Sequence, residues 1–305
     1  MTSLTSFLLI ALVVALILSA WGPGSHLEFA QRVYRTRHRK LPKQAARLLT
    51  AAPNAYFYGN LAADIINLKA FGGHLNHCHR WTIIDDMQAL AESDAEQAFI
   101  LGYLSHLAAD TIAHNHYVPY HLARYARSKG LGHLYWEMRA DSFVPESRWT
   151  LIPKLKTDPA LAPLDDLINR TVPKRALPKG ANKLIFNHVL LISERNSWRR
   201  GVERISGMAS APLEKRFLDR FHKAAVARIR LAIDPEGRKS LLHIDTTGKA
   251  AQKAAWKMRK QVMRSVTTSA KRKLRAEAQA EPFLVGMESP PSHAGPPIWE
   301  PPCLD

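Results

Sequence analysis

The sequence predicts a globular all-α protein, and three observations support this prediction. From Ser25 to about Ser206 the chain consists of successive helical segments that are separated by Pro and Gly. The two-residue alternation of apolar and polar side chains that is typical of half-buried strands is scarce. A length of 305 residues with 46% hydrophobic residues is enough for one large or two small globular domains. This composition excludes a disordered or collagen-like chain.

The first 20 residues are predicted to be a secretory signal peptide. Residues 7–18 form an almost unbroken apolar run of about a dozen residues, whereas a helix needs about 20 to cross a bilayer. The run ends at Ala20, a small residue at the expected cleavage point, and Trp21 follows it. We therefore expect export to the periplasm or out of the cell, with Trp21 as the new N-terminus. An uncleaved membrane anchor is the alternative.

Helices are expected in the following order. Ser25 and Glu28 have the spacing of a capping box, which predicts a helix through Val33. Later helices are predicted over 42–50, 61–68, 85–114 (ending before Pro119) and 132–143 (stopped at Pro145). The Pro-rich residues 151–181 are interpreted as a long connection.

The C-terminal third is strongly basic. Residues 238–275 contain 12 Lys and Arg and one acidic residue, and therefore carry most of the formal net charge of +17. Apolar residues recur every four positions from Ala250 to Leu274, which predicts a basic amphipathic helix over 246–277. Residues 281–305 include seven Pro and are predicted to be a disordered tail.

These features divide the chain into consecutive parts. The predicted units are a signal peptide (1–20), a core with the candidate site (21–150), a helical completion (151–237), a basic amphipathic helix (238–280) and a Pro-rich tail (281–305). The two cysteines, Cys78 and Cys303, are too few for a disulfide scaffold. The net charge favours anionic partners such as phospholipid headgroups or nucleic acid.

Histidines and carboxylates are concentrated in the first half of the chain. Ten of the 14 histidines lie between His26 and His133. His106, Asp110 and His114 are spaced i, i+4 and i+8, which aligns them on one helix face, and His133 and Glu137 repeat the i, i+4 spacing. One such pair is more often a solvated ion pair or a buried hydrogen bond.

Two pairs on neighbouring helices, however, favour a metal site, because imidazole and carboxylate are the ligands of Zn²⁺. Further candidates are His26, Asp64 and the cluster His74, His77 and His79. Asp64 is embedded in apolar sequence, where an unpaired carboxylate is costly, so it needs a basic partner or a metal.

The order of these Trp, His, Asp and Glu residues along the chain resembles that of the zinc-dependent phospholipase C family. The all-helical fold of this family also resembles that of zinc-dependent single-strand nucleases. The resemblance covers roughly residues 21–145 and implies about three zinc ions. It implies that an N-terminal Trp chelates zinc through its free amine and carbonyl, and that Asp64 bridges metals and orients or deprotonates the attacking water. The implied ligands are Trp21, His26, Asp64, His77 or His79, His106, Asp110, His114 or His116, His133 and Glu137. Of the first pair of alternatives His77 is favoured, and His114 and His116 rank equally.

The leading functional hypothesis is hydrolysis of phospholipids by a metal-activated water, which releases diacylglycerol and a phosphorylated headgroup. The fold expected for this function is a phospholipase C/nuclease-like bundle of several helices with a basic helical C-terminal extension. A zinc-dependent nuclease or nucleotidase on the same scaffold is the first alternative, and the net charge of +17 makes it plausible. The second is a non-enzymatic envelope protein whose basic helix over 246–277 docks on an anionic membrane surface.

Overall fold

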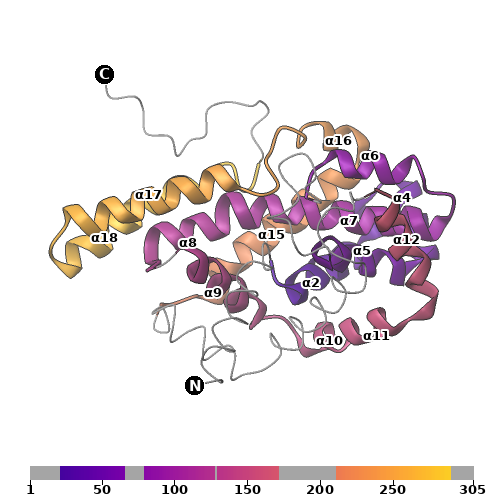
Figure 1. The fold of residues 1–305 in the computed structure, drawn as a ribbon, viewed down its shortest axis with the longest axis horizontal. Helices are drawn as coiled ribbons and strands as arrows, with labels where there is room; N and C mark the ends of the chain where they lie inside the picture. Colours follow the sequence, from indigo (N-terminus) through magenta and orange to yellow (C-terminus); the bar gives the residue numbers. More distant parts are fainter. Residues whose placement is uncertain (1–20, 66–78, 128, 172–210, 290–305) are drawn as a thin grey trace.

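The computed structural model describes residues 21–65, 79–127, 129–171 and 211–289. Within these ranges the chain forms helices and no strand, so the predicted all-α class is confirmed. The central helix is α7 (Asp94–Ile112), and α2, α4, α5, α6, α12 and α15 pack around it (Figure 1). The predicted signal segment 1–20 and both cysteines lie outside the described residues.

The first described helix, α2 (Pro23–Arg35), begins three residues earlier than expected, with Gly22 as its N-cap. Ser25 is therefore not its N-cap, and the predicted capping box with Glu28 is wrong. The backbone N–H groups of Gly24 and Ser25 instead donate to the carboxylate of Asp141, which also accepts from the Ser25 hydroxyl. A side chain from a distant helix thus satisfies donors that a local cap would otherwise pair with.

The next helices differ from the expected ranges mainly at their ends. They are α3 (Arg37–Lys40), α4 (Lys43–Ala51), α5 (Pro53–Ile65) and α6 (Thr82–Gln88). The predicted helix over 42–50 corresponds to α4, whereas the one expected over 61–68 begins earlier, at Pro53. The single helix predicted from residue 85 is wrong, because α6 and α7 are separate. Ser93 and Glu96 form a capping box that starts α7.

The helical conformation continues through Pro119 instead of ending before it. A π-helical turn, η2 (Ala113–Tyr117), follows α7 and leads directly into α8 (Val118–Tyr125). Pro119 lies in the first turn of α8. Proline is tolerated there, because the N–H groups of a first turn have no hydrogen-bond partner within their own helix. The expectation that this proline stops the helix is therefore wrong.

Residues 151–171 are helical, so the predicted long connection is wrong over that part. After α9 (Lys129–Asp141) come α10 (Glu146–Trp149), α11 (Leu151–Thr157), η3 (Pro159–Leu161) and α12 (Ala162–Thr171). Pro153, Pro159 and Pro163 all lie in first turns, which tolerate proline. Residues 172–181 lie outside the described part.

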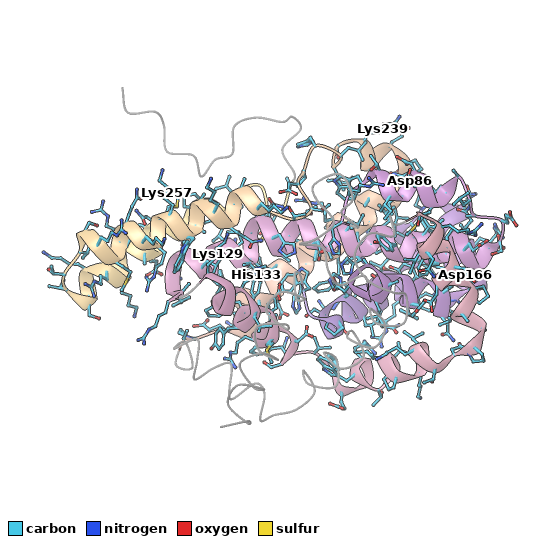
Figure 2. All side chains as sticks on the ribbon, in the orientation of Figure 1. Asp86, Lys129, His133, Asp166, Lys239 and Lys257 are labelled. Carbon is cyan, nitrogen blue, oxygen red and sulfur yellow. The ribbon has the colours of Figure 1, made fainter. Side chains whose placement is uncertain are left out.

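The basic C-terminal region forms two helices instead of the one predicted over 246–277. The elements are α15 (Lys215–Ile233), α16 (Pro235–Lys239), α17 (Lys249–Ser265), α18 (Ser269–Ala280) and η4 (Glu281–Leu284). The buried residues of α17 are Ala251, Gln252, Ala255 and Val262, and only Val262 belongs to the predicted series that starts at Ala250. Ala254 and Met258 of that series are partly buried against the core. Lysines such as Lys257 line the other side of α17 (Figure 2).

The predicted disordered tail is wrong for its first nine residues. Phe283 and Met287 are buried against the core, and residues 290–305 lie outside the described part. Among the helices that the structure describes, none combines the length and the apolar composition that a membrane crossing requires.

The crossing of α5 and α7 depends on two glycines. A Cβ atom at Gly59 would lie 2.1 Å from the carbonyl oxygen of Phe99, and one at Gly102 would lie 2.1 Å from that of Tyr56. Both helices therefore approach to backbone contact, which only glycine allows. Asp64 follows Gly59 on α5 and His106 follows Gly102 on α7, so this close crossing brings the two side chains together.

Candidate metal centre

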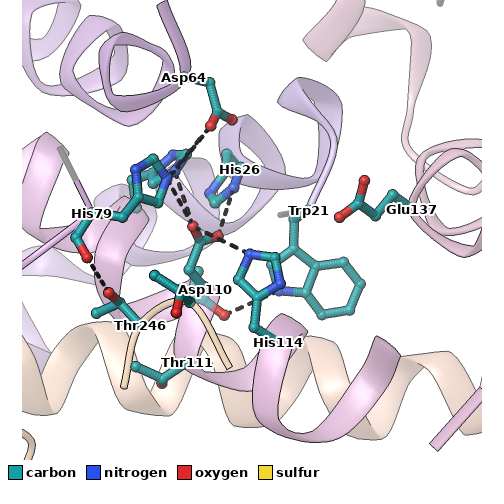
Figure 3. Close-up of polar contacts among 12 residues, drawn as sticks. Trp21, His26, Asp64, His79, Asp110, Thr111, His114, Glu137 and Thr246 are labelled. Atoms are coloured by element: carbon teal, nitrogen blue, oxygen red, sulfur yellow. Dashed lines mark hydrogen bonds and ion pairs between the residues drawn. The ribbon is translucent and has the colours of Figure 1, made fainter. Parts of the chain in front are cut away.

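Three groups of histidine and carboxylate side chains converge in the core, each with ligand atoms within 4.8 Å of one another. The groups are His26, Asp64 and His106; His79, His106 and Asp110; and His114, His133 and Glu137. They come from six separate places, namely α2, α5, the residues before α6, α7, η2 and α9. Figure 3 shows most of them arranged around Asp110.

The second group has the spacing of ligands around one ion. Nε2 of His79 and Nε2 of His106 are 3.0 Å apart, and each lies 3.2 Å from Oδ2 of Asp110. Two donors that each lie about 2.05 Å from a tetrahedral zinc are themselves separated by roughly 3.3 Å. These three atoms therefore form a nearly equilateral triangle of the size that a shared Zn²⁺ requires.

Asp64 adds a donor to the same triangle. Its Oδ1 atom lies 3.5 Å from Nε2 of His79 and 3.7 Å from Nε2 of His106. Its side chain is 20% exposed, whereas that of Asp110 is fully buried. Asp64 is thus the carboxylate of this cluster that water and a substrate can reach.

The buried polar atoms of His26 and Asp110 also fit a metal. His26 Nε2 lies 3.3 Å from Oδ1 of Asp110, and the His26 ring stacks on that of His106 at 3.8 Å. Within the described residues neither ring nitrogen of His26 and neither oxygen of Asp110 has a partner with hydrogen-bond geometry. Polar atoms buried in this way are costly, and coordination of a cation would satisfy them.

The electrostatics of these two residues favour the protonation states that zinc binding needs. Burial, followed by the charge of His106, lowers the pKa of His26 and favours the neutral imidazole. Burial opposes ionisation of Asp110, but the facing His106, His26 and His79 hold its pKa well below the usual range. Neutral imidazoles around an ionised carboxylate are the donors that a divalent metal takes.

A backbone carbonyl orients His106. Its Nδ1 atom lies 2.8 Å from the carbonyl oxygen of Asn60 on α5, so Nδ1 carries the proton and donates it. Nε2 is then left with a lone pair directed at the cluster. A metal-binding histidine commonly has this outer partner, which fixes both the tautomer and the ring orientation.

The third group depends on the π-helical turn. Nε2 of His133 lies 2.5 Å from Oε1 of Glu137 one turn later on α9, and the rings of His114 and His133 are 5.3 Å apart. His114 is also 3.9 Å from Asp110, which links this group to the second. His116 points away and pairs through Nδ1 with the carbonyl oxygen of Phe283 at 2.8 Å. Of the two alternatives, the structure brings His114 to the cluster.

Trp21 is buried beside the cluster. Its indole Nε1 donates to the carbonyl oxygen of Ala109 at 3.1 Å, and its ring stacks on that of Tyr117 at 4.6 Å. Residue 21 is thereby held next to the turn that carries Asp110, between His114 and Glu137 in the view of Figure 3. Coordination by its backbone amine stays a prediction, since it requires cleavage after Ala20.

Of the loop histidines, His79 is the one that the structure places in the cluster, where it is buried. His74 and His77 lie outside the described residues. The aromatic residues Tyr56, Tyr103 and Trp136 near the site are fully buried parts of the core.

The C-terminal segment contacts two of the candidate metal ligands, His79 and His114. The sequence did not indicate these contacts. The hydroxyl of Thr246 donates to the carbonyl oxygen of His79, and the side-chain amide of Gln252 lies 3.3 Å from Nδ1 of His114. Gly248 adopts φ 54°, and a Cβ atom there would lie 2.2 Å from the carbonyl oxygen of His114. Thr246, Gly248 and Gln252 therefore position the two histidines.

Gly248→Ala is expected to displace His114 and weaken zinc binding by about tenfold or more, as is typical when a partner of a metal ligand changes. The left-handed backbone adds roughly 1–2 kcal/mol of destabilisation. Zinc affinity and urea unfolding would be measured side by side. Gly286, at φ 74°, supplies a control with the same backbone strain. Equal zinc affinity in Gly248→Ala and Gly286→Ala would contradict the role of Gly248.

One protein-family model, described as zinc-dependent phospholipase C, matches residues 25–230, more than half of the chain. The match contains the cluster residues from His26 to Glu137. It does not extend to Trp21 or to Thr246, Gly248 and Gln252. No curated protein and no solved structure matches the sequence significantly.

Proposed function

The chain belongs to the zinc-dependent phospholipase C family, and from this we propose that it is a phosphodiesterase that cleaves phospholipids into diacylglycerol and a phosphorylated headgroup. The observation that carries the proposal is the triangle of His79, His106 and Asp110, with its zinc-sized separations. The family supplies the substrate class. The other two donor groups support the proposal that more than one zinc ion binds, although one of them shares His106 with the triangle. The proposed number of about three ions comes from the family.

The residues of the three groups would hold the zinc ions. When bound, zinc supplies positive charge for the phosphodiester oxygens and favours ionisation of water near neutral pH. Asp110 is fully buried and serves to bind and organise the cluster. Asp64 is partly exposed, and we assign it the role of orienting the attacking water and accepting its proton. Hydrolysis adds this water to phosphorus and breaks the bond to the diacylglycerol oxygen, which takes up a proton.

We also propose that the protein is exported and that cleavage after Ala20 frees the amine of Trp21. Two features support this: the apolar run over 7–18 has the length of a signal peptide, and Trp21 is buried next to Asp110. A free amine at residue 21 would add a donor beside the third group. N-terminal sequencing of the secreted protein should begin at Trp21.

The test is a product analysis with the protein beginning at Trp21 and loaded with zinc. Short-chain phospholipids that stay monomeric in solution and single-stranded DNA are offered separately. We expect diacylglycerol and a phosphorylated headgroup from the lipid. A zinc chelator should abolish the activity, and added zinc should restore it. Nucleotide release without diacylglycerol would instead establish a nuclease, and turnover that survives the chelator would exclude zinc catalysis.

A further inference from the structure

The helices α17 and α18 form an arm, residues 249–280, at one end of the molecule (Figure 1). Both helices pack on α8. Arg259 donates at 3.0 Å to the carbonyl oxygens of Arg124 and Ala126 at the end of α8, and Arg124 pairs with Glu277. The arm is therefore held to the body by specific polar contacts, and its outer face has a defined orientation.

The outer face of the arm is cationic. Residues 249–280 contain ten Lys and Arg and one acidic residue, Glu277. Four exposed cations follow one another at i, i+4, i+7 and i+11 on α17, opposite the buried alanines, and Figure 2 shows Lys257 among them. They are Lys253, Lys257, Lys260 and Arg264. Within the described residues no carboxylate lies at ion-pair distance from any of the four.

Large apolar side chains are exposed on the same arm. The structure exposes five large hydrophobic residues in its described part, and two of them lie on the arm. Met263 is close to the end of α17, and Leu274 lies midway along α18. Leu274 is 72% exposed and shares one face of α18 with the exposed Lys271 and Arg275. Trp256 is partly exposed, with Nζ of Lys260 5.5 Å from its ring.

We propose that the arm docks on the surface of an anionic lipid bilayer. Its cations would contact lipid phosphates, while Leu274 and Met263 would enter the boundary between headgroups and acyl chains. A nucleic acid would account for the cations but leaves the exposed leucine and methionine unexplained. The proposal concerns binding and goes beyond the proposed hydrolysis, because docking needs no turnover.

The test is co-sedimentation of the protein beginning at Trp21 with vesicles of phosphatidylcholine alone or mixed equally with phosphatidylglycerol. Binding is expected only to the mixed vesicles. Replacing Lys253, Lys257, Lys260 and Arg264 together by Gln should weaken it by at least about tenfold, because each cation near an anionic surface contributes a few-fold. Leu274→Ser should weaken binding several-fold.

Two control variants match these changes. Arg35, Arg39, Lys40 and Lys43 are exposed cations on the first helices, and their joint replacement by Gln removes the same charge elsewhere. Leu242→Ser changes a leucine that is 53% exposed outside the arm. Vesicle binding should be nearly unaffected by Leu242→Ser and reduced far less by the N-terminal charge variant than by the arm variant.

Three outcomes would overturn the proposal. They are equal losses from the arm and N-terminal charge variants, binding that is unchanged by Leu274→Ser, and competition by single-stranded DNA that removes the protein from the vesicles completely. Hydrolysis of monomeric short-chain lipid should be the same in the arm variants and the parent. Failure of docking is thereby distinguishable from failure of the proposed hydrolase function.

Discussion

Asp110→Asn is expected to release zinc and to reduce hydrolysis by more than about 100-fold. The loss of an outer partner of a metal ligand already costs up to about 100-fold, and Asp110 is itself a proposed ligand. Oδ2 of Asp110 lies 3.2 Å from Nε2 of both His79 and His106, and Oδ1 lies 3.3 Å from Nε2 of His26. Asparagine removes the negative charge and turns an N–H₂ group toward these nitrogens. The cluster would then lose both its central donor and its electrostatic balance.

The measurement for Asp110→Asn is the zinc content of the purified protein, determined together with turnover of monomeric phospholipid. Asp85→Asn provides a matched control, because Asp85 is exposed on α6 and outside the cluster. Parent-like zinc content and turnover are expected in this control. An Asp110→Asn protein with the full zinc content would refute the central role of Asp110.

Asp64→Asn is expected to abolish hydrolysis for a different reason. Removal of a general base typically lowers the rate about 10²–10⁴-fold, and an amide oxygen cannot accept the proton of the attacking water. His79, His106 and Asp110 remain in this variant, so most of the zinc should be retained. The helical content should stay largely intact, because the partly exposed side chain of Asp64 lies near the end of α5.

The turnover number of Asp64→Asn would be compared with that of Asp64→Glu, at equal zinc occupancy and with circular dichroism as a check of folding. The glutamate retains a carboxylate and should recover part of the lost rate. Unchanged turnover in Asp64→Asn would reject the assigned role. A rate that falls only in proportion to lost zinc would assign Asp64 to metal binding alone.

Part of the site follows from local sequence spacing. His106 and Asp110 are one helical turn apart, as are His133 and Glu137, so each pair shares a helix face wherever the helix lies. Both pairs meet as expected in the structure. The capping box of Ser93 and Glu96 is likewise local, and it could have indicated the break before α7 that the predicted single helix missed.

Other features depend on contacts between distant residues. The i+8 spacing of His114 assumes a regular α-helix, but the chain makes a π-helical turn there, so backbone conformation decides between His114 and His116. The cap of α2 comes from Asp141, more than 100 residues away. No pattern near Ser25 contains that information.

The sequence by itself determined the helical class, the pairs of ligands one turn apart and the basic character of the C-terminal third, because each depends on composition or on residues a few positions apart. Tertiary structure decided which histidines share a centre, that Thr246 and Gly248 support them, and that the basic region is an arm of two helices. The physical reason is that convergence requires helices to approach closely, as α5 and α7 do at Gly59 and Gly102. Such approaches depend on packing across the whole chain.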